Sequence, residues 1–160
     1  INKGIGGNTV HDLGIRWEDD VARHRPDWLS IKIGINDLHR TLRGDAFPVP
    51  PEKFAELYDS ILARSMEAWS PELILVSPFY ISLDDRSGAF RSTVLEMMPQ
   101  YVSTVERLAE KYNARYVPLH DIFRTHLQYR DADTFCPEPV HPYRSGHLVI
   151  AEAIMEALEG

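Results

Sequence analysis

The sequence predicts an α/β fold in which a parallel β-sheet is covered by helices on both faces. Short apolar segments alternate with longer amphipathic ones along the 160 residues, and this alternation is typical of a parallel sheet with right-handed crossovers. Leu73–Ser77 is a continuous apolar run, which indicates a strand buried on both faces. Between Phe54 and Trp69 the apolar residues lie three or four apart, which indicates an amphipathic helix. We therefore expect a three-layer α/β/α sandwich, built as a single domain over residues 1–160.

The first half of the chain supplies the following elements. Ile1–Gly7 is apolar and glycine-rich, and we expect it to be the end of a strand. Asn8 or Thr9 can cap a helix that ends before Pro26. Apolar and polar residues alternate in the strand expected at Trp28–Ile35. A polar loop, Leu38–Pro51, follows, and Pro51 is well placed to start the next helix.

The second half continues the alternation after Pro78 ends the buried strand. A turn at Asp84–Gly88 precedes a long helix, in which Pro99 predicts a kink or a fresh helix start. The remaining expected elements are a strand at Arg115–Leu119, a helix capped by Asp121 and reaching about Tyr129, an irregular stretch at Asp131–His141, and a last helix from about Tyr143 to Leu158.

Composition excludes several classes of function. The net charge of −7 and the scattered arginines argue against nucleic acid as a partner, because such binding depends on clustered basic residues. Cys136 is the only cysteine, so no intramolecular disulfide and no cysteine metal cluster can form. No apolar run approaches the roughly 20 residues that span a bilayer. No signal peptide is visible, and we expect a cytoplasmic protein.

Three short patterns carry possible chemistry. In Glu138-Pro139-Val140-His141 an acid can turn back to orient an imidazole as a general base, although an incidental ion pair in a surface loop fits the same residues. In Gly34-Ile35-Asn36-Asp37 the Asn36 amide can donate to a developing oxyanion, or the residues can form an ordinary turn. In Gly6-Gly7-Asn8-Thr9 a glycine N–H can approach a ligand closely, but the Gly-Lys-Ser/Thr ending of a phosphate loop is absent.

Taken together and in this order, the three patterns resemble the SGNH (GDSL) hydrolase family. Gly7 matches the glycine of that family's second block, Gly34–Asp37 matches its Gly-x-Asn-Asp block, and His141-Pro142 matches its Asp-x-x-His-Pro block, with Glu138 in the place of aspartate. The resemblance covers the whole chain. It implies a flavodoxin-like α/β/α fold, His141 as general base, Glu138 as the residue that orients it, and Gly7 and Asn36 as oxyanion donors. It implies no metal and no organic cofactor.

The family's Gly-Asp-Ser block is not found in the sequence. The resemblance implies that this block follows a first strand inside the sheet, and removing such a strand would leave unpaired backbone groups at a cost above a typical stability of about 5–15 kcal/mol. We therefore expect the N-terminal strand and the nucleophile to lie upstream of Ile1. Ser30 and Ser77 belong to strands, not to tight turns, and Ser145 is better suited to capping a helix.

The resemblance thus implies a serine-dependent carboxylic ester hydrolase, acting on a short acyl or acetyl ester of a sugar or small molecule. By position, Leu38–Pro51 and Phe79–Gly88 shape the substrate pocket, and Tyr80, Phe47 and Arg40 can line it. Two alternatives stay open: a catalytically inactive relative that only binds a ligand, and a flavodoxin-like nucleotide-binding domain that uses the glycine loop. The oligomeric state does not follow from the sequence.

Overall fold

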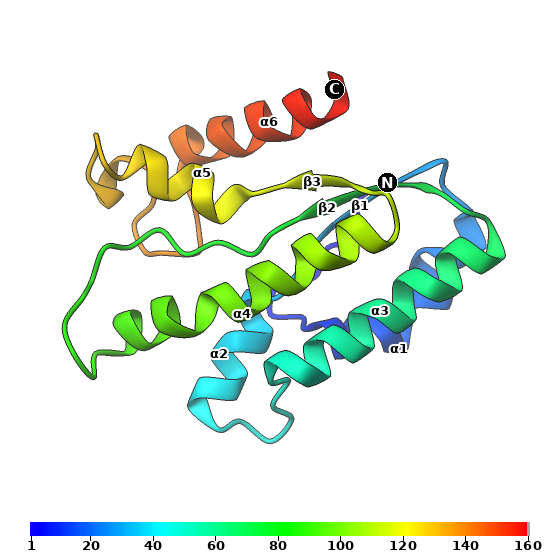
Figure 1. The fold of residues 1–160 in the computed structure, drawn as a ribbon, viewed down its shortest axis with the longest axis horizontal. Helices are drawn as coiled ribbons and strands as arrows, with labels where there is room; N and C mark the ends of the chain where they lie inside the picture. The colour runs from blue at the N-terminus through cyan, green and yellow to red at the C-terminus, as the bar shows by residue number, and fades with distance from the viewer. Residues whose placement is uncertain (160) are drawn as a thin grey trace.

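The computed structural model describes residues 1–159 and shows three parallel strands flanked by helices (Figure 1). In chain order the elements are α1 (Val10–Asp20), a 3-10 turn (Ala22–His24), β1 (Trp28–Lys32), α2 (Ile35–Arg43), α3 (Pro51–Ala68), β2 (Glu72–Val76), α4 (Phe90–Lys111), β3 (Arg115–Val117), α5 (Leu119–His126), a second 3-10 turn (Ala132–Thr134) and α6 (Arg144–Glu159). None of the helices in this part of the chain is long and apolar enough to cross a bilayer.

The sheet has the order β1-β2-β3, and all pairs are parallel. Residue Leu29 pairs with Leu73 and Ile31 with Leu75, while Val76 pairs with Val117. The central strand β2 is the continuous apolar run of the sequence, and its last four residues are buried. Because all strands are parallel, their carboxyl ends meet at one edge of the sheet, where functional groups gather in this class of fold.

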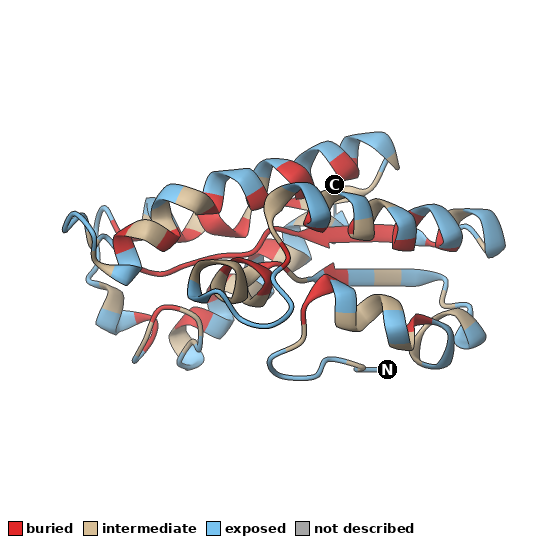
Figure 2. Cartoon of the chain, turned by 90° about the horizontal axis from the view of Figure 1, so that it is seen from below, coloured by how far each residue is buried: buried red, intermediate tan, exposed pale blue. Residues whose placement is uncertain are grey.

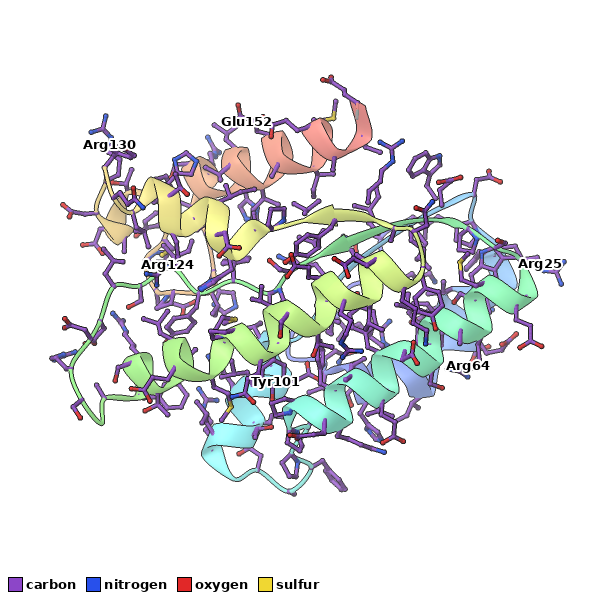
Figure 3. The ribbon with its side chains drawn as sticks, in the orientation of Figure 1. Arg25, Arg64, Tyr101, Arg124, Arg130 and Glu152 are labelled. Carbon is purple, nitrogen blue, oxygen red and sulfur yellow. The ribbon has the colours of Figure 1, made fainter. Side chains whose placement is uncertain are left out.

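Helices cover both faces of the sheet, as expected. Helices α1, α3 and α4 lie on one side, and α5 and α6 lie on the other (Figure 1). Each side has its own apolar cluster, centred on Phe54 and Tyr101 on the first side and on Phe123 and Phe135 on the second. The buried positions face the sheet and the exposed ones face outward (Figure 2). Accordingly, the charged side chains of Arg64, on α3, and Glu152, on α6, point away from the sheet (Figure 3).

Two expectations in the N-terminal half are wrong, the strand at Ile1–Gly7 and the loop that begins at Leu38, while the strand at Trp28 is confirmed but shorter. Residues 1–8 form no strand, since an extended segment needs a neighbour for its backbone hydrogen bonds and β1 pairs only with β2 within residues 1–159. The strand expected at Trp28–Ile35 stops at Lys32, and the supposed loop after it begins with helix α2. Leu38 anchors this short helix, because its side chain is fully buried in the core.

The later elements differ from expectation only at their ends. Helix α4 runs through Pro99 as one helix, so no fresh start occurs there. Asp121 lies in the first turn of α5 and does not cap it, because the helix already begins at Leu119 after Pro118. Ser145 is not a cap either, since its hydroxyl donates to the carbonyl of Thr134 at 2.5 Å.

A groove of about 580 Å³ lies beside the edge of the sheet formed by β1. The N-terminal segment, α1 and β1 line it, and its walls include Trp17 from α1 and Ile31 from β1. The backbone groups on this edge of β1 have no paired strand among residues 1–159. An edge of this kind is a template for the addition of a further strand.

Candidate active site

Helix α2 begins directly where β1 ends, because Gly34 makes a sharp change of direction. Its φ of 125° is in a region that side-chain-bearing residues rarely adopt. A Cβ at this position would also meet Phe54 Cζ at 3.1 Å and Pro78 Cγ at 3.2 Å. Glycine is therefore required on both counts, and the turn places Asn36 and Asp37 in the first turn of α2.

A second glycine turn precedes α1. Gly7 has a φ of 83°, and the N–H of Asn8 donates to the carbonyl of Ile5 at 3.3 Å. Thr9 then caps α1 in a capping box, in which its side chain and that of Asp12 each bond the other's backbone N–H. The capping predicted for Thr9 is thus confirmed, and the turn at Gly7 is held at the start of a helix.

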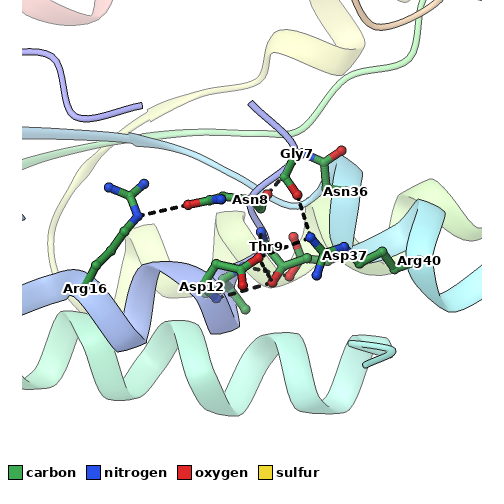
Figure 4. Close-up of polar contacts among 9 residues, drawn as sticks. Gly7, Asn8, Thr9, Asp12, Arg16, Asn36, Asp37 and Arg40 are labelled. Carbon is green, nitrogen blue, oxygen red and sulfur yellow. Dashed lines mark hydrogen bonds and ion pairs between the residues drawn. The ribbon is translucent and has the colours of Figure 1, made fainter. Parts of the chain in front are cut away.

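Helix α2 and the Gly7 turn lie side by side, although about 30 residues separate them in the chain (Figure 4). The Asn36 Nδ2 amide donates to the carbonyl of Asn8 at 3.0 Å. The Val10 N–H donates to Asp37 Oδ1 at 2.8 Å. An amide nitrogen carries two hydrogens, so a second donor remains on Asn36 beside the Gly7 turn. The structure therefore brings together the two residues expected to stabilise an oxyanion.

Asp37 is a fully buried carboxyl group in this arrangement. Burial raises its pKa from 3.8 to about 7, and the negative charge of Asp12 adds to this, while the hydrogen bond from Val10 and the charge of Arg40 oppose it. Its Oδ2 atom has no hydrogen-bond partner within residues 1–159. Neither its burial nor its bond to α1 was predicted, because the sequence pattern singles out only its neighbour Asn36.

The pair expected to provide the general base is formed. Glu138 Oε1 is in hydrogen-bonding contact with His141 Nδ1. The imidazole is largely exposed, with 83% of its side chain accessible, so it can be reached by a substrate. This geometry leaves Nε2 free to accept a proton, with the carboxylate positioned to stabilise the resulting imidazolium.

Backbone hydrogen bonds from neighbouring residues hold the loop that carries Glu138 and His141. The N–H of Ile81, which follows β2, donates to the carbonyl of Pro139 at 2.9 Å, and the N–H of Tyr143 donates to the carbonyl of Phe135 at 2.7 Å. A Cβ at position 146 would lie 2.7 Å from the Phe135 carbonyl oxygen, so Gly146 permits the close approach of α6 to the loop.

A chain of contacts connects α2 to this loop. The ring of His39, on α2, packs edge-on against Tyr80 with centroids 5.8 Å apart, and the next residue, Ile81, holds Pro139. Burial lowers the pKa of His39, as does the charge of Arg43, while Glu138 acts in the opposite direction. Both groups of predicted site residues therefore lie near the carboxyl ends of the strands.

Ser77 and His120 are in contact but are buried, so they do not form a second, accessible pair of nucleophile and base. Ser77 is fully buried, and its Oγ accepts the N–H of His120 at 3.1 Å. Burial lowers the pKa of His120 to about 4, and its Nδ1 accepts the N–H of Tyr80 at 3.4 Å. No group of three or more histidine, cysteine, aspartate or glutamate residues within 1–159 is arranged to hold a metal ion.

Comparison with known proteins decides the family. The sequence profile of the GDSL-like lipase/acylhydrolase family matches residues 1–149. The chain belongs to this family. An acetylxylan esterase of Geobacillus stearothermophilus is 35% identical to it over 163 residues, which cover 99% of this chain and 71% of that protein.

Solved structures of similar proteins share the fold. The crystal structure of Axe2, an acetylxylan esterase from Geobacillus stearothermophilus, superposes with a TM-score of 0.85 at 31% identity and covers 98% of this chain and 70% of that one. LAE5, an α/β hydrolase enzyme from the metagenome of Lake Arreo in Spain, gives a TM-score of 0.86 at 30% identity, with 98% and 71% coverage. The fold class and the resemblance predicted from the sequence are therefore confirmed, and the family is one of carboxylic ester hydrolases.

Proposed function

We propose that this GDSL-like protein removes acetyl groups from an acetylated sugar, by acyl transfer through a serine. The observation that carries the proposal is the contact between Glu138 and His141. In Axe2, a serine, an aspartate and a histidine have each been replaced by alanine in structures described as catalytic mutants, and that aspartate lies three residues before the histidine. The same spacing separates Glu138 from His141, with glutamate in place of aspartate.

In the proposed reaction His141 is the general base. Its Nε2 removes the proton from the serine hydroxyl as the oxygen attacks the acetyl carbonyl, and later returns that proton to the departing sugar oxygen. A water molecule, activated by the same imidazole, then releases acetate. Glu138 keeps the imidazole in the required tautomer and stabilises its charged form. The longer side chain of glutamate is compatible with this role, because it already contacts Nδ1.

The negative oxygen of the tetrahedral intermediate requires hydrogen-bond donors. Asn36 Nδ2 and the N–H of Gly7 are proposed for this role, supported by the hydrogen bond that places Asn36 beside the Gly7 turn. Donors of this kind act where charge develops, and each contributes roughly 3–4 kcal/mol to lowering the barrier in known enzymes.

The serine itself is proposed to come from a strand that adds to the edge of β1. Two features support this placement: the unpaired edge of β1 within residues 1–159, and the groove of about 580 Å³ beside it. In a parallel sheet such a strand would end at the same edge as Gly34, close to Asn36. The nucleotide-binding alternative has no comparable support, because the GDSL-like profile covers both the glycine turn and the histidine loop.

The test is ester hydrolysis by the full-length protein. Wild-type protein is expected to release p-nitrophenol from p-nitrophenyl acetate and acetate from acetylated xylo-oligosaccharides. His141→Ala is expected to lower kcat by about 1000-fold or more, because it removes the only proton acceptor proposed for the serine. His147→Ala, which removes an exposed histidine on α6, is the matched control and should leave kcat unchanged. Equal activity of the two variants would exclude His141 as the base, and an inactive wild type would favour a relative that only binds its ligand.

A further inference from the structure

Helix α2 holds three consecutive peptide units of the Gly7–Val10 segment. Arg40 Nη2 donates to the carbonyl of Gly7 at 2.9 Å. Asn36 donates to the next carbonyl, that of Asn8, at 3.0 Å, and Asp37 accepts the N–H of Val10 at 2.8 Å. These three side chains converge on one short stretch of backbone (Figure 4).

The Arg40 guanidinium is itself held in place. It forms an ion pair with Asp12 Oδ2 at 3.4 Å, and the same carboxylate closes the capping box at Thr9. Arg40 therefore connects the first turn of α1 to the carbonyl of Gly7. Its side chain is 32% exposed, so it sits at the surface of this junction and not in the core.

Backbone freedom explains why such support matters at this position. Gly7 has a φ of 83° and no Cβ, so no side chain limits its backbone torsions or the direction in which its N–H points. A donor to an oxyanion must be oriented before the charge develops, and an error of about 1 Å can cost on the order of 100-fold in rate. Fixing the carbonyls of Gly7 and Asn8 restricts rotation on the C-terminal side of Gly7, and the bond from the Asn8 N–H to the carbonyl of Ile5 closes the turn that contains the peptide unit of the Gly7 N–H.

We propose that Arg40 and Asp37 are positioning residues, which hold the Gly7–Val10 backbone so that the Gly7 N–H and the Asn36 amide meet the same oxygen. This inference rests on the proposed function. Arg40, which the sequence placed at the substrate pocket, acts in this proposal through the carbonyl of Gly7, and Asp37 acts through the N–H of Val10. Asp37 fixes the start of α1 against α2, and Arg40 fixes the turn that precedes it.

The kinetic test uses Arg40→Ala, Arg40→Lys and Arg115→Ala in the full-length protein, with p-nitrophenyl acetate as substrate. Arg40→Ala is expected to lower kcat by about tenfold with KM within about twofold, because only the alignment of a donor is lost. Arg40→Lys keeps a cationic donor and is expected to recover at least half of the lost kcat. Arg115 also donates to a backbone carbonyl, that of Ala157, so Arg115→Ala loses the same kind of bond elsewhere and should keep wild-type kcat.

A second readout does not depend on activity. Amide hydrogen exchange in residues 6–10 is expected to be at least tenfold faster in Arg40→Ala than in wild type, while exchange in α3 and α4 stays unchanged. A raised KM with unchanged kcat would overturn the proposal, because it would make Arg40 a substrate-binding residue. The proposal would also be overturned if Arg40→Ala had the same kcat, and the same exchange rates in residues 6–10, as Arg115→Ala.

The two readouts separate this inference from the proposed function. If the wild-type protein hydrolyses no ester, the proposed function fails. Hydrogen exchange then still tests whether Arg40 holds the Gly7–Val10 backbone. Faster exchange in residues 6–10 of Arg40→Ala supports this role, and unchanged exchange rejects it.

Discussion

Replacing Asp37 by asparagine is expected to make the protein more stable above neutral pH. The carboxyl group has a pKa of about 7 in the folded protein and about 3.8 when unfolded, because burial penalises its charged form. Between these values the folded state binds more protons than the unfolded state, so stability falls as pH rises from about 4 through 7 and then levels off. At 1.36 kcal/mol for each pKa unit, the loss has an upper limit of about 4 kcal/mol.

Asparagine removes this loss and keeps the main contact. Its Oδ1 can still accept the N–H of Val10, which Asp37 binds at 2.8 Å. Its amide nitrogen replaces Oδ2, an atom without a partner within residues 1–159. The hydroxyl of Tyr58 is also buried and unpartnered there, and burial together with the charge of Asp37 raises the pKa of Tyr58, so a neutral amide at position 37 also removes a charge from this buried region. The variant is therefore expected to match wild type near pH 4 and to exceed it by up to about 4 kcal/mol at pH 8.

Urea unfolding followed by circular dichroism at pH 4, 6 and 8 measures this difference. Asp45→Asn is the matched control, since Asp45 is an exposed carboxylate just after α2, and its replacement should shift stability little at any of these pH values. The reasoning is refuted if Asp37→Asn and wild type change in parallel between pH 4 and pH 8. It is also refuted if the variant is less stable than wild type at pH 8, because the buried carboxylate would then be stabilising.

Two further predictions concern the site. Asn36→Ala is expected to lower kcat for p-nitrophenyl acetate by about 100-fold or more with little change in melting temperature, and an unchanged kcat would remove Asn36 from the mechanism. Gly146→Ala is expected to destabilise the fold by about 1–3 kcal/mol in urea unfolding, because a Cβ there lies 2.7 Å from both the Phe135 carbonyl oxygen and Pro142 Cβ. Gly14→Ala is its control: the new methyl group meets only Ile61 Cδ1, at 3.9 Å, so helix α1 should gain up to about 1 kcal/mol. Equal stability of the two glycine variants would contradict the close packing of α6 on the histidine loop.

Local patterns in the sequence determined much of the fold. The apolar run from Leu73 predicts a strand covered on both faces, and the structure buries it at the centre of the sheet. Pro51 and the apolar stripe after it predict helix α3 at its observed start. The spacing of Glu138 and His141 brings the acid within reach of the imidazole through a short loop, so this pair follows from the sequence. In each case neighbouring residues supply the physical cause.

Only the tertiary structure decided the arrangement around Asn36. Helix α2 was mistaken for a loop because it is only nine residues long and its apolar stripe consists of just Ile35, Leu38 and Leu42, so its stability depends on packing these side chains against the core. The high pKa of Asp37 and the bond from Arg40 to Gly7 depend on α1 and α2 lying side by side, although the residues involved are about 30 positions apart. Burial and hydrogen bonding across such distances are properties of packing. The sequence by itself therefore identified the candidate site residues, whereas their environment depended on the folded chain.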